Sequence, residues 1–443
     1  MTIAAPLTFG PALCFMLLAL GVALLTRFRP WCGPAAIVAT APFAWYHGAG
    51  PTEITLAKAA SAGAVIGYAA LLARDRAARQ AAASALKASP AVWLLAAFAI
   101  VSVLSIAWAV DSADAVRDAL KWAWYAAVFA LTIAAVNGAG ARFKIAAVLL
   151  VTASAVALVG LWQNVTVAPA AFVASGGALV NRITATLEGP NQFGAYLETG
   201  IPLLIAVLLF GRLPRIAIVA GSVVLGVLVT NLLLTYSRGA LWSCAAASVF
   251  LLAAYAFSVA SRRTLPEPVP LVTAAAAAIL AAAVIVPIAR VSITSIGWQH
   301  ELWTSGLRDT SDSAEQRKQL WTCAVSLIRR YPLAGVGAGN FADIKSDCKG
   351  ALSARDNSNA NQWYLETAAD LGVIGLALLV SFLAFMLATA RSAVLWEEPV
   401  AIGAYAVLLA FVLHGLVDDV MTYPKAALSF FVVLGLIPTR RNS

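Results

Sequence analysis

The stretch LGVIGLALLVSFLAFMLATA, from Leu371 to Ala390, decides the fold class of this chain. It carries no charged residue, and an apolar run of about 18 or more residues is typical of a helix that crosses a bilayer. A second such run, LVTAAAAAILAAAVIVPI, extends from Leu271 to Ile288. The two runs enclose residues 290–366, the one long polar segment. We therefore expect a large loop outside the membrane, carrying most of the chemistry.

Composition extends this interpretation to the whole chain. Of 443 residues, 61% are hydrophobic and 12% are charged, whereas soluble domains have about 25% charged residues. Repeated apolar runs without period-2 alternation exclude an outer-membrane barrel. The sequence predicts an all-α polytopic membrane protein with 12 or 13 transmembrane helices. The expected spans are 11–26, 32–46, 54–73, 91–110, 122–136, 145–162, 192–210, 216–235, 240–260, 271–289, 372–390, 401–417 and 426–438. We expect the first to be a retained helix rather than a signal peptide.

The charges of the connecting segments predict the orientation. One set of loops is basic: Arg27/Arg29, Arg74/Arg76/Arg79/Lys87, Arg142/Lys144, Arg212/Arg215, Arg262/Arg263, Arg391 and Arg440/Arg441. The alternate set comprises residues 47–53, 111–118, 163–191, 236–239, the long loop and 418–425. By the positive-inside rule the basic set is cytoplasmic and the other set faces the periplasm or exterior. The net charge of +9 follows from this distribution, so it does not indicate a nucleic-acid partner.

The long loop has some internal organisation. Residues 313–331 have helical periodicity, and Tyr331-Pro332 ends that helix. Gly335-Val-Gly-Ala-Gly339 predicts a tight turn; it is no dinucleotide fingerprint, because no βαβ unit surrounds it. Cys323 and Cys348 could form a disulfide in an oxidising compartment. We expect the other three cysteines, Cys14, Cys32 and Cys244, to be small packing residues.

Arginines at span ends are candidate functional residues. Arg238 lies between two spans, where it is either an interfacial anchor or a clamp on a phosphate. Arg317, on the loop helix, is either a solvated charge or a second clamp. Arg182 and the turn Glu188-Gly-Pro-Asn191 precede another span on the same side. Three arginines on one membrane face would suit a diphosphate. His414 is either a packed residue or part of the site.

The motifs together resemble a known family. RITATLEGPNQFGAYL (182–197), TYSRGALW (235–242), Arg317-xxx-Trp321, YPLAGVGAGNF (331–341), NQWYLETAADLGVIGL (361–376) and LHGLVDDVMTYP (413–424) occur in this order. The order is similar to that of the O-antigen ligase and Wzy-type polysaccharide polymerase family. The resemblance divides the chain into N-terminal helices, 1–180, and a ligase/polymerase-like domain, 181–443, that includes the loop 290–366.

The resemblance implies a GT-C-type membrane glycosyltransferase that uses no metal and no cofactor. Such an enzyme takes a glycan from undecaprenyl diphosphate and passes it, with inversion, to an acceptor hydroxyl on the periplasmic side of the bacterial inner membrane. By family pattern Arg238 and Arg317 bind the diphosphate, which is the leaving group. Fixed cations stabilise the charge that it gains in the transition state.

The motif positions supply the remaining site residues. We expect catalytic roles for Glu366, Asn361 and Asn359, beside the two clamp arginines. We expect substrate-binding roles for Arg182, Asn191, Tyr236, Trp321, Asn340, Tyr364 and His414. We expect no metal ligands, because no Cys/His metal spacing occurs in the sequence.

The chain departs from the family at one position. The family commonly has His-x-His-Asn before its Tyr-Leu-Glu, and ligases use a histidine there, whereas this chain has Asn359-Ala-Asn361-Gln362. Asparagine cannot take a proton, so the base could be Glu366, Asp343, Glu188 or His300. Alternatively, Asn359 and Asn361 only orient the acceptor. The departure favours a polymerase of O-antigen or exopolysaccharide.

The other interpretations differ mainly in the acceptor. A ligase would use lipid A–core, and a protein O-oligosaccharyltransferase would use a protein. The alternative to a glycosyltransferase is a transporter of lipid-linked glycans. A transporter would have charges and broken helices at mid-membrane. The expected partners are the undecaprenyl-diphosphate glycan, the acceptor glycan or lipid A–core, the bilayer and a chain-length regulator.

Overall fold

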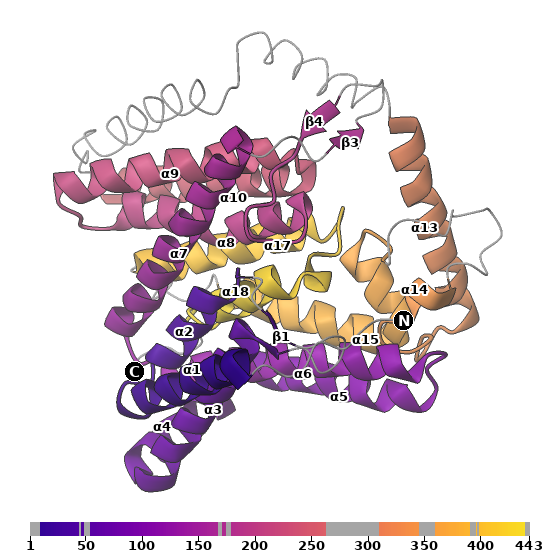
Figure 1. Ribbon diagram of the computed structural model, residues 1–443, viewed down its shortest axis with the longest axis horizontal. Helices are drawn as coiled ribbons and strands as arrows, with labels where there is room; N and C mark the ends of the chain where they lie inside the picture. The colour runs from indigo at the N-terminus through magenta and orange to yellow at the C-terminus, as the bar shows by residue number, and fades with distance from the viewer. Residues whose placement is uncertain are drawn as a thin grey trace.

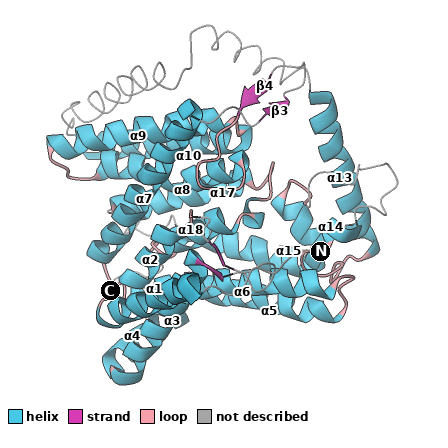
Figure 2. Ribbon diagram, in the orientation of Figure 1, coloured by secondary structure: helices cyan, strands magenta, loops and turns pink. Residues whose placement is uncertain are grey.

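The computed structural model describes residues 9–43, 46–47, 54–166, 171–173, 179–262, 310–344, 359–389, 396 and 398–438. Over these residues the chain is almost entirely helical (Figure 1, Figure 2). Most helices run side by side across the view of Figure 1, and α13 (Thr310–Arg330) stands across their direction at one end. The expected class, an all-α polytopic membrane protein, is confirmed.

Among the described residues, seven helices are long and apolar enough to cross a membrane. They are α3 (Leu56–Arg74), α5 (Pro90–Leu104, followed by a 3-10 turn to Ala107), α7 (Ala139–Thr166), α8 (Pro190–Phe210), α9 (Arg215–Thr235), α10 (Arg238–Arg262) and α15 (Trp363–Ala388). Shorter apolar stretches lie in α1 (Phe9–Phe28), α17 (Pro399–His414) and α18 (Pro424–Leu434).

Two further helices occupy expected spans but differ from simple membrane helices. α2 (Cys32–Thr40) has only nine residues. α6 (Ser112–Ala135) begins ten residues before the expected span and carries four charged side chains in its first turns: Asp114, Arg117, Asp118 and Lys121. Each expected span thus coincides with a helix except 271–289, which lies outside the described residues.

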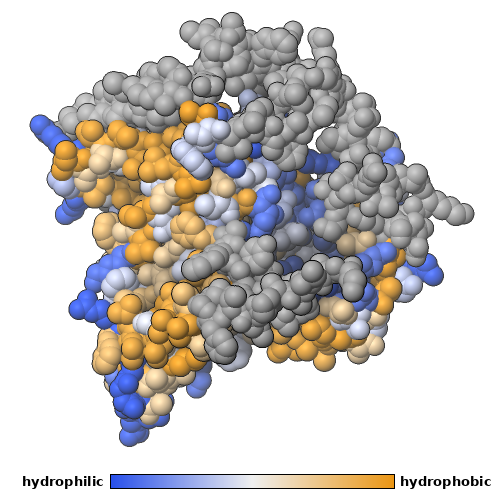
Figure 3. Space-filling view, in the orientation of Figure 1, coloured by the Kyte–Doolittle hydropathy of each residue, from blue (hydrophilic) through white to orange (hydrophobic). Residues whose placement is uncertain are grey.

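The basic segment after α3 forms a helix of its own, α4 (Arg76–Lys87), where we expected only a charged loop. Asp75 caps it by accepting a hydrogen bond from the Ala78 amide at 3.0 Å, which satisfies one of the free donors of its first turn. Only Ala82 of this helix is buried. Figure 3 shows hydrophilic residues at this lower tip and apolar surface beside it. α4 is therefore a polar projection from the bundle.

Two short antiparallel hairpins lie in connecting segments. β1 (Tyr46–His47) pairs with β2 (Ile54–Thr55), and β3 (Ala171–Val173) pairs with β4 (Leu179–Asn181). Neither was expected from the sequence, because strands of two or three residues leave no periodic pattern. The second hairpin leads directly into the segment that holds Arg182.

The helix expected at residues 313–331 is present as α13, which ends before Tyr331-Pro332 as predicted. Leu320, Ala324 and Leu327 bury its apolar face, so the helix is fixed to the bundle. Cys323, on the same face, is disulfide-bonded; its expected partner, Cys348, lies outside the described residues. Cys14 is exposed, not packed as expected, whereas Cys244 is buried.

The glycine-rich turn after α13 docks on α15 through its backbone. The amides of Val336 and Gly337 donate to the carbonyls of Ala369 and Asp370 at 3.0 and 2.8 Å. The Asp370 carboxylate accepts from the amides of Gly339 and Phe341 at 2.9 and 2.8 Å, and Phe341 begins the short helix α14 (Phe341–Ile344). The turn is therefore a structural joint.

Positive φ angles explain the glycines of this joint. Gly335 (φ +66°) has no room for a Cβ, which would lie 2.3 Å from the Asp370 backbone. Gly372 (φ +65°) kinks α15, and its Cβ would lie 2.3 Å from the Leu333 backbone. The helix therefore begins earlier than the expected span 372–390. Residues 363–371, expected outside the span, form the first turns of α15.

The core lies around α8, where most residues of the span are buried. It packs against α10 and α17, and α18 closes the core beneath them. The rings of Phe411 and Phe430 stack with centroids 4.1 Å apart, which joins α17 to α18. Because α8 and α17 are enclosed, polar side chains at their ends meet in the interior.

Candidate active site

Arg182 and Arg238 lie next to each other where α9 ends and α10 begins. The Arg182 guanidinium donates to the Thr235 carbonyl and to Asn191 Oδ1, both at 2.8 Å. Burial, followed by the nearby charge of Arg238, lowers the pKa of Arg182. Arg238 is the first residue of α10 and is exposed. Two cations are thus held together at a helix N-terminus, an arrangement that attracts anions.

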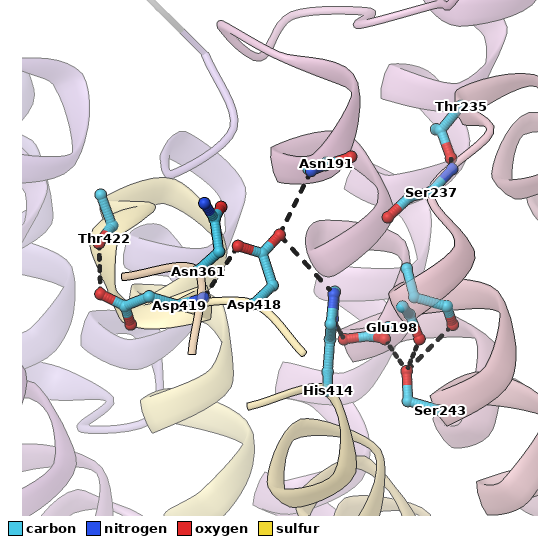
Figure 4. A network of polar contacts seen from close by, with 12 residues as sticks. Asn191, Glu198, Thr235, Ser237, Ser243, Asn361, His414, Asp418, Asp419 and Thr422 are labelled. Atoms are coloured by element: carbon cyan, nitrogen blue, oxygen red, sulfur yellow. Dashed lines mark hydrogen bonds and ion pairs between the residues drawn. The ribbon is translucent and has the colours of Figure 1, made fainter. Parts of the chain in front are cut away.

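His414, at the end of α17, is the centre of a buried polar network (Figure 4). Its Nδ1 lies 3.0 Å from Glu198 Oε2, and its Nε2 lies 4.0 Å from Asp418 Oδ2. The Ser243 hydroxyl donates to the other oxygen of Glu198. These residues come from α8, α10 and the α17–α18 turn, so the network joins three parts of the fold. The contact with Glu198 holds the buried imidazole in one orientation.

Two glycines allow α10 to lie close to His414 and to α8. A Cβ on Gly239 would lie 2.6 Å from the His414 ring, and one on Gly194 would lie 2.9 Å from the Ala240 Cβ. Gly239 follows Arg238 in the Tyr-Ser-Arg-Gly motif, and Gly194 belongs to the 182–197 motif, in α8. Gly194 therefore lets α8 approach α10, and Gly239 lets the His414 ring approach the start of α10.

α13 brings the third arginine to the same place. Arg317 lies close enough to His414 for its charge to act on the imidazole. One turn further along, the Trp321 ring nitrogen donates to the Ala360 carbonyl at 3.1 Å. This bond ties α13 to the Asn-Ala-Asn segment. Arg182, Arg238 and Arg317, although far apart in the sequence, thus lie near one end of α17.

The Asn-Ala-Asn segment lies against the α17–α18 turn. Asn361 has a left-handed backbone (φ +49°), and its amide donates to Asn359 Oδ1 at 3.2 Å. Asn359 Nδ2 lies 3.4 Å from the Thr422 hydroxyl, which donates to Asp419 at 2.5 Å. Burial raises the pKa of the Asp419 carboxyl, although the charge of Lys121 opposes the shift.

Glu366 lies on the other side of that segment. Its Oε2 accepts from the Ala360 amide at 2.6 Å, and its side chain lines a large cavity together with Asn359 and Thr422. One carboxylate oxygen is thereby fixed. Among the four carboxyl and imidazole groups that the sequence offered as a base, Glu366 is the one that adjoins both the Asn-Ala-Asn segment and a cavity.

The other candidate bases are placed less favourably. Glu188 is 59% exposed and pairs with Lys425 at 2.5 Å. Asp343 lies on α14, where burial and the Asp114 charge raise its pKa. His300 lies outside the described residues. No geometric observation therefore favours these three over Glu366.

Four predicted substrate-binding residues have structural contacts. Asn191 bridges Arg182 and Asp418, with its Nδ2 3.3 Å from the carboxylate. Tyr236 has a left-handed backbone (φ +52°) at the end of α9. The buried Asn340 bonds both backbone groups of Asp111, at 2.6 and 3.1 Å. The Tyr364 hydroxyl donates to the Val412 carbonyl at 2.8 Å.

Glu198 and Ser243 were missed by the sequence analysis. The available signal was Glu198 itself, the single charged residue within the expected span 192–210, because an ionisable residue inside a span is a functional candidate by default. Within the described part of the chain, no group of three or more His, Cys, Asp or Glu side chains is arranged to hold a metal.

The sequence comparison bears on this geometry directly. The model of the O-antigen ligase family matches residues 221–380. The resemblance to that family is confirmed over this segment. The matched residues include Arg238, Arg317 and Glu366, whereas Arg182 and His414 lie outside them. A comparison with curated proteins found no match. The match thus covers α10, α13 and the first part of α15, whereas α8 and α17 lie outside it.

Proposed function

We propose that the protein is a membrane glycosyltransferase that moves a glycan from undecaprenyl diphosphate to a sugar hydroxyl. The observation that carries the proposal is the convergence of Arg182, Arg238 and Arg317 on the end of α17. Guanidinium groups match phosphate oxygens with paired hydrogen bonds. The family match supports a transferase of lipid-linked glycans.

In the proposed reaction the acceptor hydroxyl attacks the anomeric carbon from the face opposite the diphosphate, which inverts the configuration. The carbon–oxygen bond to the diphosphate breaks, and its electron pair leaves with that group. Arg238 and Arg317 stabilise the charge on the departing diphosphate. This role needs no metal, so we propose a metal-independent enzyme.

Glu366 takes the proton of the attacking hydroxyl in this mechanism. Its position beside Asn359 and the cavity supports that role, because a base must lie within hydrogen-bond reach of the proton that it removes. Asn359 and Asn361 orient the acceptor. His414, fixed by Glu198 at 3.0 Å, binds the donor side of the substrate together with Arg182.

We propose a polymerase of O-antigen or exopolysaccharide, because asparagines stand where ligases have a histidine. The second candidate is an O-antigen ligase that uses lipid A–core, which the description of the matching family favours; a protein O-oligosaccharyltransferase differs from it only in the acceptor. We place the active site on the periplasmic side of the bacterial inner membrane, because the basic loops are on the opposite side.

The test is transfer by purified protein in detergent with EDTA, using a polyprenyl-diphosphate oligosaccharide as sole substrate. A polymerase yields products that increase by one repeat unit. A ligase yields product only after lipid A–core is added. No product with either acceptor, while the protein still binds the donor and moves it across vesicle membranes, would support a transporter instead.

A further inference from the structure

A groove of about 1370 Å³ lies between α3 and α6, on the far side of the Asn-Ala-Asn segment from the arginines. It exceeds the roughly 300–1,000 Å³ of ordinary small-molecule pockets. The Trp124 ring nitrogen donates to the Ser61 hydroxyl at 3.0 Å, a bond that joins the two helices, and both residues line the groove. The mechanism above uses only the part of the groove where Glu366 and Asn359 lie.

The groove changes character along its length. Its membrane part is lined by apolar side chains, namely Ala62, Val65, Ile66, Ala127, Val128 and Leu131. Val65 and Ile66 are 48% and 60% exposed. From Leu120 to Leu131 the lining follows α6 for about 16 Å at the helical rise of ~1.5 Å per residue, about half of the roughly 30 Å hydrocarbon core. This part has the length and lining that suit a lipid chain.

The outer part of the groove is charged but balanced. Its described lining has three cationic side chains, Lys58, Arg117 and Lys121, and three acidic ones, Asp114, Asp118 and Glu366. Arg117 pairs with Asp114 at 2.6 Å, and Lys121 pairs with Asp118. Such a surface offers hydrogen-bond donors and acceptors to the hydroxyl groups of a sugar. It therefore suits sugar.

The segment Asn359–Asn361 separates the groove from the arginine cluster. Asn359 and Thr422 line the groove, and Thr422 bonds Asp419, next to the residue that faces His414. A substrate in the groove and a diphosphate at the arginines would thus approach each other across Asn359–Asn361. Two lipid-linked substrates would enter from different sides of the molecule.

We propose that the α3–α6 groove binds the acceptor as a glycolipid, with its lipid chain along the apolar part and its sugar against Asp118, Asn359 and Glu366. The proposal rests on the proposed function, since it assigns the second substrate of the same reaction. It places the attacking hydroxyl beside Glu366 and leaves the diphosphate to Arg182, Arg238 and Arg317.

Direct capture tests the site without relying on catalysis. A photoreactive residue replaces Val65 in the groove or, as the control, Val223, which is 44% exposed on α9. The full-length protein is illuminated in phospholipid nanodiscs that contain the repeat-unit oligosaccharide on a long alkyl chain. This probe has no diphosphate and cannot act as donor. We expect capture of the probe at Val65 and phospholipid at Val223; phospholipid alone at both positions would overturn the proposal.

Transfer assays then identify the occupant. Ala62→Trp and Ala127→Trp fill the groove from exposed positions, and Ala69→Trp and Ala123→Trp are exposed controls on the same helices outside it. With the long-chain acceptor we expect the groove variants to lose at least about tenfold in kcat/KM, the loss that two displaced methylene groups would give. With a short water-soluble acceptor they should match the controls.

The outcomes separate the two proposals. An increase of the donor KM alone would assign the groove to the donor lipid and overturn the acceptor site. Equal loss with both acceptors would show that the groove does not hold the lipid chain. Absence of transfer by the unmodified protein, together with capture at Val65, would refute the transferase while leaving the glycolipid site.

Discussion

At the scale of single residues, the site depends on the position of His414. The imidazole lies between Glu198 and Asp418 (Figure 4) and against Gly239, where a Cβ would come within 2.6 Å of the ring. Because Arg238 precedes this glycine, any displacement of the ring also moves the α10 N-terminus. His414 therefore links the arginine cluster to the buried network.

Gly239→Ala should lower transfer strongly while leaving the protein folded. The new methyl group must push His414 out of its contact with Glu198 or lift the first turn of α10. Gly21→Ala is the matched control, because its Cβ would meet nothing within 4 Å. Transfer rates of the two purified variants give the comparison. Full activity of the Gly239→Ala variant would show that transfer does not depend on the position of the His414 ring.

Glu366→Gln should reduce kcat by about 10²–10⁴, the usual contribution of a general base, with little effect on the donor KM. The amide oxygen can still accept the hydrogen bond from the Ala360 amide, so the local structure is kept. Steady-state kinetics with both substrates measures kcat and the donor KM of the variant. Unchanged turnover would exclude Glu366 as the base.

Only part of this arrangement could be predicted from the sequence. Arg182, Arg238 and Arg317 were predicted on one membrane face, and the structure brings them to one place. Glu198 and Ser243 could not be inferred as partners of His414, because pairing between three separate helices is set by tertiary packing. For Asn340, the motif indicated a functional position, whereas the contact with Asp111 is a backbone anchor.

At the scale of elements, the glycine-rich turn holds α13 over the site. It docks on α15 through backbone hydrogen bonds and through the Asp370 carboxylate. The sequence predicted a tight turn that lets backbone approach something closely. It did not reveal that this surface is the kinked start of α15, because the kink at Gly372 has no signature in an apolar run.

Gly335→Ala should detach this joint. A left-handed backbone costs alanine about 1–2 kcal/mol, and its Cβ would also collide with the Asp370 backbone at 2.3 Å. We expect a lower apparent melting temperature in detergent and loss of transfer, because α13 carries Arg317. Gly140→Ala, which has open space around the Cβ, is the control. Equal melting temperatures and rates would contradict the structural role of the joint.

At the scale of the whole molecule, orientation decides which compartment holds the reaction. The unbroken alternation of basic and other loops predicts a cytoplasmic α4 and an external α13. The helices themselves were predictable from apolar runs, whereas the early start of α6 was not, because its charged first turns look like loop. Those turns form the mouth of the α3–α6 groove.

The orientation predicts opposite labelling of two exposed positions, Ser84 on α4 and Thr322 on α13. In a background with Cys14→Ala, Thr322→Cys should react with a membrane-impermeant maleimide on intact spheroplasts. Ser84→Cys should react only after the membrane is opened. The reverse pattern would place the arginines on the cytoplasmic side and contradict a periplasmic reaction.

The most direct test of the central claim is transfer from a polyprenyl-diphosphate oligosaccharide by Arg238→Ala and Arg317→Ala, with Arg329→Ala as control. Arg329 is exposed in the last turn of the same helix as Arg317. We predict that each site variant loses about 10²–10³ in kcat, the cost of removing one preorganised donor, that Arg→Lys is also poor, and that the control is unaffected. Normal turnover and polymer length in both site variants would contradict the diphosphate clamp.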